Sequence, residues 1–402
     1  MIYSVKTDIK LYFIILCLST TISCDSSDAV QVWHKGNLHT HSLWSDGDDF
    51  PEMIIDWYKN NDYQFIAISD HNTLADTQYW YGLTEKDIQN RTLDKYLQSF
   101  GEDWVETKVD SSVTSVRLKT FDEYRSKLEE KGTFLIIRSE EVTSSFEKNP
   151  IHINVTNIQK KIDPVKGTSV VDVMQKTLDL VKAQRKKLGI PMFAHINHPN
   201  FGYGVSTNDL KKLNGERFFE VYNGHPQVNN EGNDMFDSTE IMWDLINIHY
   251  YQQGKPLLLG IATDDSHNYH DFSEKNSNTG RGWVMVDSKE LNTASLINAM
   301  EKGDFYASTG VYLKSIKKTS RELTIEIDAE NGVNYELIFL GYKEGSEMVK
   351  ELKRVNGAKA NYVFQEEDIF VRVKVISNEP KDSPDGTNEL KQAWVQPILI
   401  KG

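Results

Sequence analysis

The stretch that decides the fold is FPEMIIDWYKNNDYQFIAISDHN, residues 50–72. Its first half carries apolar residues near helical spacing, and Pro51 suits the first turn of a helix. Its second half, residues 63–72, has the pattern of a buried strand that ends in the polar side chains of Asp70 and His71. The stretch therefore predicts a helix followed by a strand, with polar groups at the carboxyl end of the strand.

The same rhythm continues along the chain. Helical patterns that stop near a glycine alternate with short apolar runs, and each apolar run ends in polar residues. The predicted helices cover residues 121–132, 169–189 and 238–255, and the predicted strands cover residues 133–143, 190–200, 217–224 and 256–268. Repeated units of this kind predict an α/β fold with a parallel sheet, either a barrel or an open doubly wound sheet, and such folds build active sites at the carboxyl ends of their strands.

Two segments depart from this rhythm. Residues 73–119 interrupt it between a strand that ends in polar groups and the next helix, and we expect this insertion to be a lid or a specificity loop. For Trp80, Tyr81 and Trp104 within it, core packing is the preferred interpretation and substrate stacking the alternative. Residues 311–402 offer short alternating runs separated by turn signals such as ENG, VNG and SPDG, which predict a small C-terminal antiparallel β-domain of sandwich type.

The first 24 residues have the order of an export signal. Lys6 and Lys10 precede an apolar run that is too short to span a bilayer comfortably, and Cys24 follows small or apolar residues. This pattern resembles a bacterial lipoprotein signal, so we expect an exported protein whose contact with the membrane is a lipid on Cys24. The alternative is an ordinary signal peptide in which the cysteine has no role. Cys17, the other cysteine, lies inside the apolar run.

The composition limits the chemistry. Of 402 residues, 45 are basic and 59 acidic, and the net charge of -14 argues against a sequence-independent grip on nucleic acid. Without cysteines in the mature chain, a metal would have to be held by His, Asp and Glu, a ligand set that suits Zn, Mn or Fe. The oligomeric state cannot be predicted from this sequence.

Six short motifs bring such ligands to the ends of the predicted strands. In chain order they are HTHSLWSDG (39–47), SDHN (69–72), EEVT (140–143), HINV (152–155), NHPN (197–200) and TDDSH (263–267). The ordered set resembles the PHP (polymerase and histidinol phosphatase) family of metal-dependent phosphoesterases, and the resemblance covers residues 34–310. It implies a distorted barrel of seven β/α units within residues 25–310, with two or three divalent ions at the carboxyl ends of the strands.

The resemblance also implies a ligand set. His39, His41 and Asp265 would hold one ion, His152 and His198 a second, and Glu141 would bridge the two. Asp46, His71 and His267 would hold a third ion.

Several neighbours compete for these roles. Ser139 stands where the family often has glycine, which leaves Glu140 as an alternative to Glu141. His195 competes with His198, and it is otherwise a strand residue or a hydrogen-bond donor that supports a ligand. Asp264 is taken as a neighbour of Asp265, and Asp70 as a carboxylate that orients His71.

The predicted reaction is hydrolysis of a phosphate ester on a small phosphorylated substrate. A water that bridges two dications loses its proton near neutral pH and becomes the nucleophile, while the same ions neutralise charge on the phosphoryl oxygens. We expect Arg281, between Gly280 and Gly282, to grip the phosphate. Asn223 and His225 are predicted to contact the substrate or to protonate the leaving group. A surface turn for Arg281 and a structural turn for His225 are the alternatives.

Two other functions fit the same residues. The activated water could attack an amide or ester carbon, as in amidohydrolases. Alternatively, the chain could be a non-catalytic, surface-anchored protein that binds a glycan or a protein through its C-terminal domain, with the metal site serving the structure alone.

Overall fold

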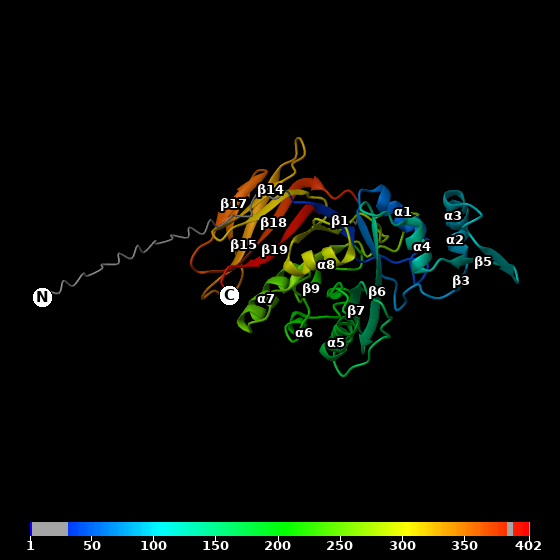
Figure 1. The fold of residues 1–402 in the computed structure, drawn as a ribbon, viewed down its shortest axis with the longest axis horizontal. Helices are drawn as coiled ribbons and strands as arrows, with labels where there is room; N and C mark the ends of the chain where they lie inside the picture. Colours follow the sequence, from blue (N-terminus) through cyan, green and yellow to red (C-terminus); the bar gives the residue numbers. More distant parts are fainter. Residues whose placement is uncertain (2–30, 384–388, 402) are drawn as a thin grey trace. The chain divides into compact units, whose positions relative to one another are not determined.

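A 13-stranded sheet runs through the described part of the chain in the order β10-β9-β8-β7-β6-β2-β1-β11-β12-β19-β18-β15-β16 (Figure 1). The computed structural model describes residue 1, residues 31–383 and residues 389–401. The export signal and Cys24 lie outside the described residues. The strands are β1 (Trp33–Asn37), β2 (Phe65–Ile68), β6 (Leu135–Phe146), β7 (Asn149–Thr156), β8 (Phe193–Ile196), β9 (Phe218–Asn223), β10 (Leu259–Thr263), β11 (Trp283–Asp287), β12 (Phe305–Ser308), β15 (Tyr335–Lys343), β16 (Lys350–Asn356), β18 (Asp368–Pro380) and β19 (Leu390–Leu399).

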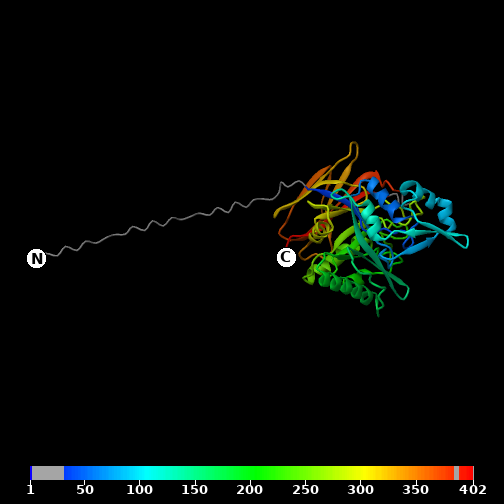
Figure 2. The ribbon, with the colours of Figure 1, turned by 45° about the vertical axis from the view of Figure 1, so that its right-hand side comes forward.

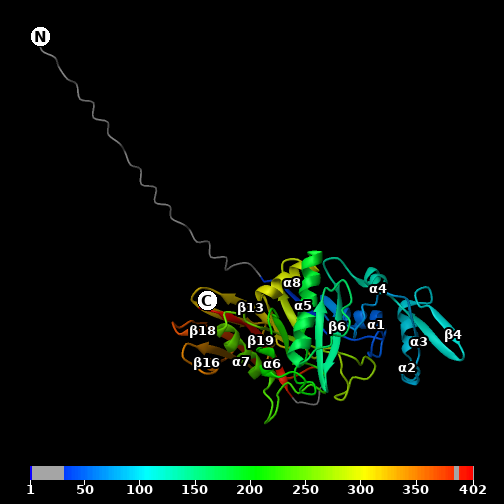
Figure 3. The same cartoon turned by 90° about the horizontal axis from the view of Figure 1, so that it is seen from below.

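Helices separate many of these strands. The helix α5 (Val170–Leu188) has clear ends. The Ser169 side chain accepts a hydrogen bond from the Asp172 N–H, and Gly189 ends the helix with a φ of 65°, which glycine adopts without strain. This helix packs along β6, β7 and β8 (Figure 3). The helices are α1 (Pro51–Asn60), α4 (Phe121–Leu128), α5 (Val170–Leu188), α6 (Thr207–Leu210), α7 (Thr239–Gln252) and α8 (Thr293–Lys302).

The strand directions differ in part from the prediction. β1, β2 and β6 are parallel, as are β8, β9 and β10, but β7 is antiparallel to both β6 and β8. Only Glu147 and Lys148 separate β6 from β7, and a connection this short can join only antiparallel strands. The sheet is therefore mixed, and a regular set of seven β/α units is not seen among the described residues.

β10 and β1 are the outermost strands of the series that carries the site, and the segments that follow these two strands meet. β10 packs against β11 and β12, and an isolated bridge joins Thr40 to Ser266. His41 N–H donates to the Ser266 carbonyl at 2.9 Å, and Asp265 N–H donates to the His39 carbonyl at 3.1 Å. The sheet therefore curves around a buried apolar interior lined by Leu38, Phe65, Ala67, Ile137, Phe193, Phe218, Leu259, Ile261 and Val284.

The C-terminal strands continue this sheet. A second sheet, with the order β13-β14-β17, packs face to face with it through one apolar core (Figure 2). The predicted antiparallel pairing is present, but β19 pairs with β12 and so joins the C-terminal strands to the site-bearing ones. The strands of the second sheet are β13 (Leu313–Lys318), β14 (Glu322–Ile327) and β17 (Lys359–Val363).

The insertion forms a small α/β lobe. Its strands β3 (Tyr79–Gly82), β5 (Val113–Leu118) and β4 (Thr107–Asp110) make a three-stranded sheet beside α2 (Glu85–Asn90) and α3 (Thr92–Phe100). Glu52 of α1 anchors the lobe, because its buried carboxylate accepts hydrogen bonds from the Tyr96 hydroxyl at 2.8 Å and the Trp104 indole at 2.9 Å. Within the described residues, no helix combines the length and the apolar character that crossing a membrane requires.

Candidate metal centre

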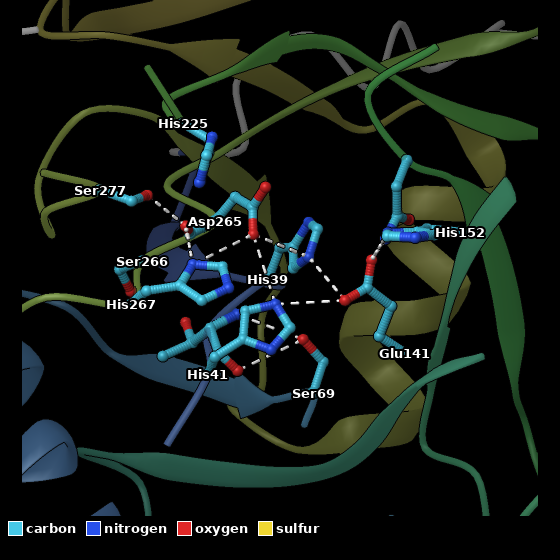
Figure 4. A network of polar contacts seen from close by, with 12 residues as sticks. His39, His41, Ser69, Glu141, His152, His225, Asp265, Ser266, His267 and Ser277 are labelled. Carbon is cyan, nitrogen blue, oxygen red and sulfur yellow. Dashed lines mark hydrogen bonds and ion pairs between the residues drawn. The ribbon is translucent and has the colours of Figure 1, made fainter. Parts of the chain in front are cut away.

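Segments from most of the chain converge at the carboxyl end of β1 (Figure 4). His39 and His41 follow β1, Glu141 lies in β6 and His152 in β7, and Asp265 follows β10. Asp265 has a φ of 50°, in the left-handed region that aspartate adopts more readily than most residues with a side chain. All the candidate metal ligands named from the sequence are part of this cluster.

Two histidines and two carboxylates form the centre of the cluster. His39 Nε2 lies 3.4 Å from Glu141 Oε2 and 3.1 Å from Asp265 Oδ1. His41 Nε2 lies 3.2 Å from the same oxygen of Glu141 and 3.3 Å from the same oxygen of Asp265. Each of these side chains is almost fully buried. The structure thus brings together the three residues expected at the first ion, His39, His41 and Asp265, with Glu141 beside them.

The second oxygen of Glu141 faces a different pair of histidines. Glu141 Oε1 lies 3.0 Å from His152 Nδ1 and 3.6 Å from His198 Nε2. The second oxygen of Asp265 also lies 3.8 Å from His198 Nε2. Because its two oxygens point into two adjacent groups of ligands, Glu141 has the geometry of a carboxylate that bridges two ions.

A third group lies at the more open side of the cluster. Asp46, whose side chain is 56% exposed, places its carboxylate 3.6 Å from His41 Nδ1 and 3.5 Å from His71 Nε2. His267 Nε2 lies 3.5 Å from the same carboxylate. His71 also faces Glu141, with Nδ1 at 2.9 Å from Oε2. This group is therefore continuous with the other two.

The spacing of these atoms fits divalent ions. Ligand bonds of about 2.1 Å in a tetrahedral site separate neighbouring ligand atoms by about 3.4 Å. The central nitrogen–oxygen distances lie between 3.1 and 3.4 Å. In addition, His39 Nε2, His41 Nε2, Glu141 Oε2 and His152 Nδ1 are buried and have no hydrogen-bond partner among the described residues. Buried polar atoms normally have partners, so the convergence of these four atoms indicates a site that suits a cation.

The pKa shifts in the metal-free protein also indicate that the carboxylates of the cluster favour positive charge beside them. Burial opposes the ionisation of Glu141, but the charges of His71 and His39 hold its pKa well below the usual range. Burial opposes protonation of His39, yet Asp265, Glu220 and Glu141 raise its pKa well above the ordinary value. These carboxylates thus favour the protonated form of His39, which must lose a proton before its Nε2 can bind a metal.

The structure separates the competing neighbours. Glu140 points away from the cluster and accepts a hydrogen bond from Ile162 N–H at 2.9 Å, whereas Glu141 faces the histidines. Asp264 accepts the backbone N–H groups of residues 280, 281 and 282. Asp70 accepts from Ser42 and Ser45, so the expectation that it orients His71 is wrong. The imidazole of His195 is buried and lies beside Glu220 and the ring of His39.

Arg281 does not take the predicted position. Its side chain is fully buried, and the guanidinium donates to the Gly224 carbonyl at 2.8 Å and the Ser273 carbonyl at 3.1 Å. The backbone of residues 280–282, which we expected to approach a phosphate, is instead occupied by the Asp264 carboxylate. The guanidinium thus donates to backbone carbonyls and the neighbouring backbone donors go to Asp264, so nothing among the described residues supports a phosphate grip by Arg281, and its burial contradicts the alternative of a surface turn.

Asn223 and His225 lie beside the cluster. Asn223 Nδ2 donates to Asp265 Oδ2 at 3.1 Å, which places the amide behind a candidate ligand. The His225 ring lies 5.5 Å from the ring of His267, centroid to centroid, and its side chain is directed toward Asp265 (Figure 4). Its Nδ1 accepts a hydrogen bond from Gln227 N–H at 3.1 Å. A neutral His225 therefore carries its proton on Nε2.

Two residues of the site were not predicted. Asn197 donates to Glu141 Oε1 at 2.7 Å, and Glu220 in β9 contacts His39. The signal for Glu220 was present, because an ionisable residue inside the apolar run RFFEVYNG is rarely buried without a partner. Asn197 lies within the NHPN motif and had no pattern that distinguished it from a turn residue.

The fold and the cluster together define a protein with a candidate polynuclear metal centre. Among solved structures, the chain is similar to a two-domain protein from Bacteroides vulgatus that contains a predicted PHP-like metal-dependent phosphoesterase, with 15% identity and a TM-score of 0.40, covering 91% of this chain and 95% of that one. A structure from Bifidobacterium adolescentis, provisionally described as a metal-dependent phosphoesterase, shares 11% identity at a TM-score of 0.33 and covers 68% of this chain and 96% of its own.

A third similar structure is an amidohydrolase from Chromobacterium violaceum with bound sulfate and no metal. It shares 12% identity at a TM-score of 0.30, covering 67% of this chain and 96% of that one. No family model and no curated protein matches the sequence. Two of these three structures are thus described in terms of metal-dependent phosphoesterases and one as an amidohydrolase.

Proposed function

We propose that this protein is a metal-dependent hydrolase that cleaves a phosphate ester of a small substrate. The observation that carries the proposal is the convergence of unpartnered imidazole nitrogens on the two oxygens of Glu141. His39, His41 and Asp265 would hold one ion, and His152 and His198 a second, with Glu141 shared between them. Asp46, His71 and His267 would hold a third. When bound, such ions supply an activated water as the nucleophile and offset charge on the phosphoryl oxygens.

His225 supports the proposal from the side of the leaving group. Because Gln227 N–H holds its Nδ1 as an acceptor, a neutral His225 can offer its Nε2–H as a hydrogen-bond donor to the leaving oxygen. Asn223 acts differently, because its amide donates to Asp265 and so orients a ligand. We therefore assign to His225 a hydrogen bond to the leaving oxygen, and to Asn223 the orientation of Asp265.

The experiment uses chelator-stripped protein reloaded with Mn²⁺ or Zn²⁺. Hydrolysis of p-nitrophenyl phosphate and bis(p-nitrophenyl) phosphate is followed by absorbance, and a nucleotide panel by phosphate release. We expect turnover that depends on metal, is lost in His41→Ala and is retained in Glu140→Gln, whose side chain points away from the cluster. If fully metallated protein cleaves neither monoesters nor diesters, the proposed reaction is wrong.

The placement of Arg281 favours one second candidate, hydrolysis of a C–N or C–O bond. A phosphate ester is usually gripped by a cationic side chain, and this guanidinium is directed to carbonyl oxygens instead. The same metallated protein is therefore assayed with aryl amides and esters. Cleavage of those substrates, together with no inhibition by inorganic phosphate, would favour this candidate over the phosphoesterase.

We also propose that the protein is exported and carries a lipid on Cys24, from the order of residues 1–24 alone. The test is metabolic labelling with a fatty acid in a bacterial host, comparing the wild type with Cys24→Ser. We expect label in the membrane fraction of the wild type only. Equal labelling, or no labelling of either protein, contradicts the proposal.

A further inference from the structure

Glu220 is a carboxylate behind the metal cluster, and both of its oxygens accept hydrogen bonds. It lies in β9 and is fully buried. Its Oε1 accepts from His39 Nδ1 at 2.7 Å and from the Thr263 hydroxyl at 2.9 Å. His195 Nε2 lies 3.4 Å from the same oxygen. These three side chains come from β8, from β10 and from the segment after β1, so one carboxylate contacts three parts of the sheet.

The second oxygen of Glu220 holds the rest of the site. Oε2 accepts from the backbone N–H of His198 at 2.7 Å and from Asn223 Nδ2 at 2.8 Å. The same amide of Asn223 donates to Asp265 Oδ2 at 3.1 Å. Glu220 therefore contacts two candidate ligands directly and reaches a third through Asn223.

The bond to His39 has a specific consequence for metal binding. A histidine that donates Nδ1–H to a carboxylate keeps the lone pair of Nε2 free, and the carboxylate makes that nitrogen more basic. In this structure, His39 Nε2 is the atom that faces Glu141 and Asp265. The carboxylate behind the ring thus fixes both the tautomer and the direction of the ligand.

We propose that Glu220 is a positioning residue of the metal centre, which orients His39, His198 and Asp265 without binding an ion itself. The inference rests on the proposed metal centre. His39, His195 and Glu220 lie close enough together to suggest an additional ion site, but the donors already directed at both Glu220 oxygens leave no free lone pair suited to a cation.

The test compares Glu220→Gln with Glu216→Gln, using the full chain. Glu216 is a buried glutamate just before the other end of β9, and it has no contact with the cluster among the described residues. Zn²⁺ affinity is measured by competition with a chromophoric chelator, and the thermal stability of the metal-free proteins by circular dichroism. We expect Glu220→Gln to weaken Zn²⁺ binding about 10- to 100-fold. The affinity of Glu216→Gln should match that of the wild type.

Two further readouts separate positioning from a ligand or a purely structural role. At saturating metal, Glu220→Gln should bind as many ions as the wild type, and its Co²⁺-loaded form should show a shifted visible spectrum. Loss of one ion with unchanged affinity for the others would make Glu220 a ligand and overturn the proposal. A lower melting temperature with unchanged affinity and spectrum would also overturn it. If Glu220→Gln does not fold, Glu220→Asp is tested in the same way, with the same expectations.

A failure of this inference differs from a failure of the proposed function. Wild-type protein that binds no metal would remove the metal centre as a whole. If Glu220→Gln binds metal as tightly as the wild type does, only the positioning role of Glu220 is wrong.

Discussion

His39 Nε2 and Asp265 Oδ1 lie 3.1 Å apart, although the strands that precede them, β1 and β10, are not neighbours in the sheet. In the hydrogen-bonded order, β9, β8, β7, β6 and β2 lie between β10 and β1. The two residues meet because the sheet curves until its β10 edge returns to β1, where a bridge joins Thr40 to Ser266. The metal centre therefore depends on the closure of the sheet as well as on the ligand side chains.

The first prediction concerns the shared carboxylate. Glu141→Gln removes a charge that faces ligands of all three groups, so we expect metal affinity to fall by more than about 100-fold, beyond the loss typical of a supporting residue. Metal content after desalting, measured by plasma mass spectrometry, checks this. The matched control is Glu140→Gln, one position away, whose carboxylate accepts from Ile162 N–H. Equal metal content in both variants would contradict the bridging role.

The second prediction concerns pH and the metal-free protein. Burial disfavours the charged form of His71, but Glu141 and Asp46 raise its pKa to about 11. A pKa raised by folding adds stability that is fully present below the unfolded value near 6.5 and is lost as the pH rises toward 11. We expect the metal-free protein to lose stability across this window in urea unfolding, and His71→Asn to flatten the loss. A stability that rises with pH in the wild type would contradict the assignment.

Arg281 gives a third prediction. Arg281→Lys keeps the charge but cannot reach the carbonyls of Gly224 and Ser273 with the same planar fork. We expect a loss of roughly 1–3 kcal/mol in the free energy of unfolding, because buried acceptors lose their donors. The KM of the folded variant for an aryl phosphate should equal that of the wild type. A large rise in KM with unchanged stability would restore the phosphate grip.

The fourth prediction concerns the attachment of the C-terminal strands. Arg372 of β18 is buried and pairs with Asp244 of α7, with Nε at 2.7 Å from Oδ1. Asp244→Asn takes one of two carboxylate partners from the buried guanidinium and leaves Glu240 as the other, so it should cost about 1.5–3 kcal/mol in urea unfolding. The exposed pair of Arg91 and Asp94 serves as the control, because Asp94→Asn should cost at most about 1 kcal/mol. Equal costs in the two variants would argue against a structural role for the buried pair.

The fifth prediction concerns the wall of the site. The ring of Phe201 lies 5.1 Å from the ring of His198 and 6.0 Å from that of His225, and the side chain is half-buried. A substrate group that extends from the ions toward Phe201 would pack against its ring. We expect Phe201→Ala to lower kcat/KM for aryl substrates about 3- to 10-fold relative to alkyl ones. Phe364→Ala, in the C-terminal strands, should leave this ratio unchanged, and a matching change there would contradict the assignment.

Much of the site could be predicted because its ligands occupy local motifs. His39, His41 and Asp46 share one short segment, and the order of six such segments indicated one family. The helices α1, α4, α5 and α7 were also predicted from periodicity and their end signals. What these features share is that spacing along the chain determines them, so no knowledge of distant contacts was needed.

The rest depends on contacts between distant segments. The antiparallel course of β7 follows from a two-residue connection that periodicity does not reveal. The partners of Arg281 and Asp70 are set by loops that meet only in the folded chain, and the sequence GRG looked suited to a phosphate when Asp264 in fact occupies its backbone donors. Glu220 was missed because its importance lies in hydrogen bonds from His39, His198 and Thr263, which are distant from one another along the chain.

The most direct test of the central claim is anomalous diffraction from crystals grown with Zn²⁺ or Mn²⁺, recorded on both sides of the absorption edge of the metal. The account predicts one peak among His39, His41, Glu141 and Asp265, and a second among Glu141, His152 and His198. Ions bound elsewhere on the chain, with none beside Glu141, would contradict it.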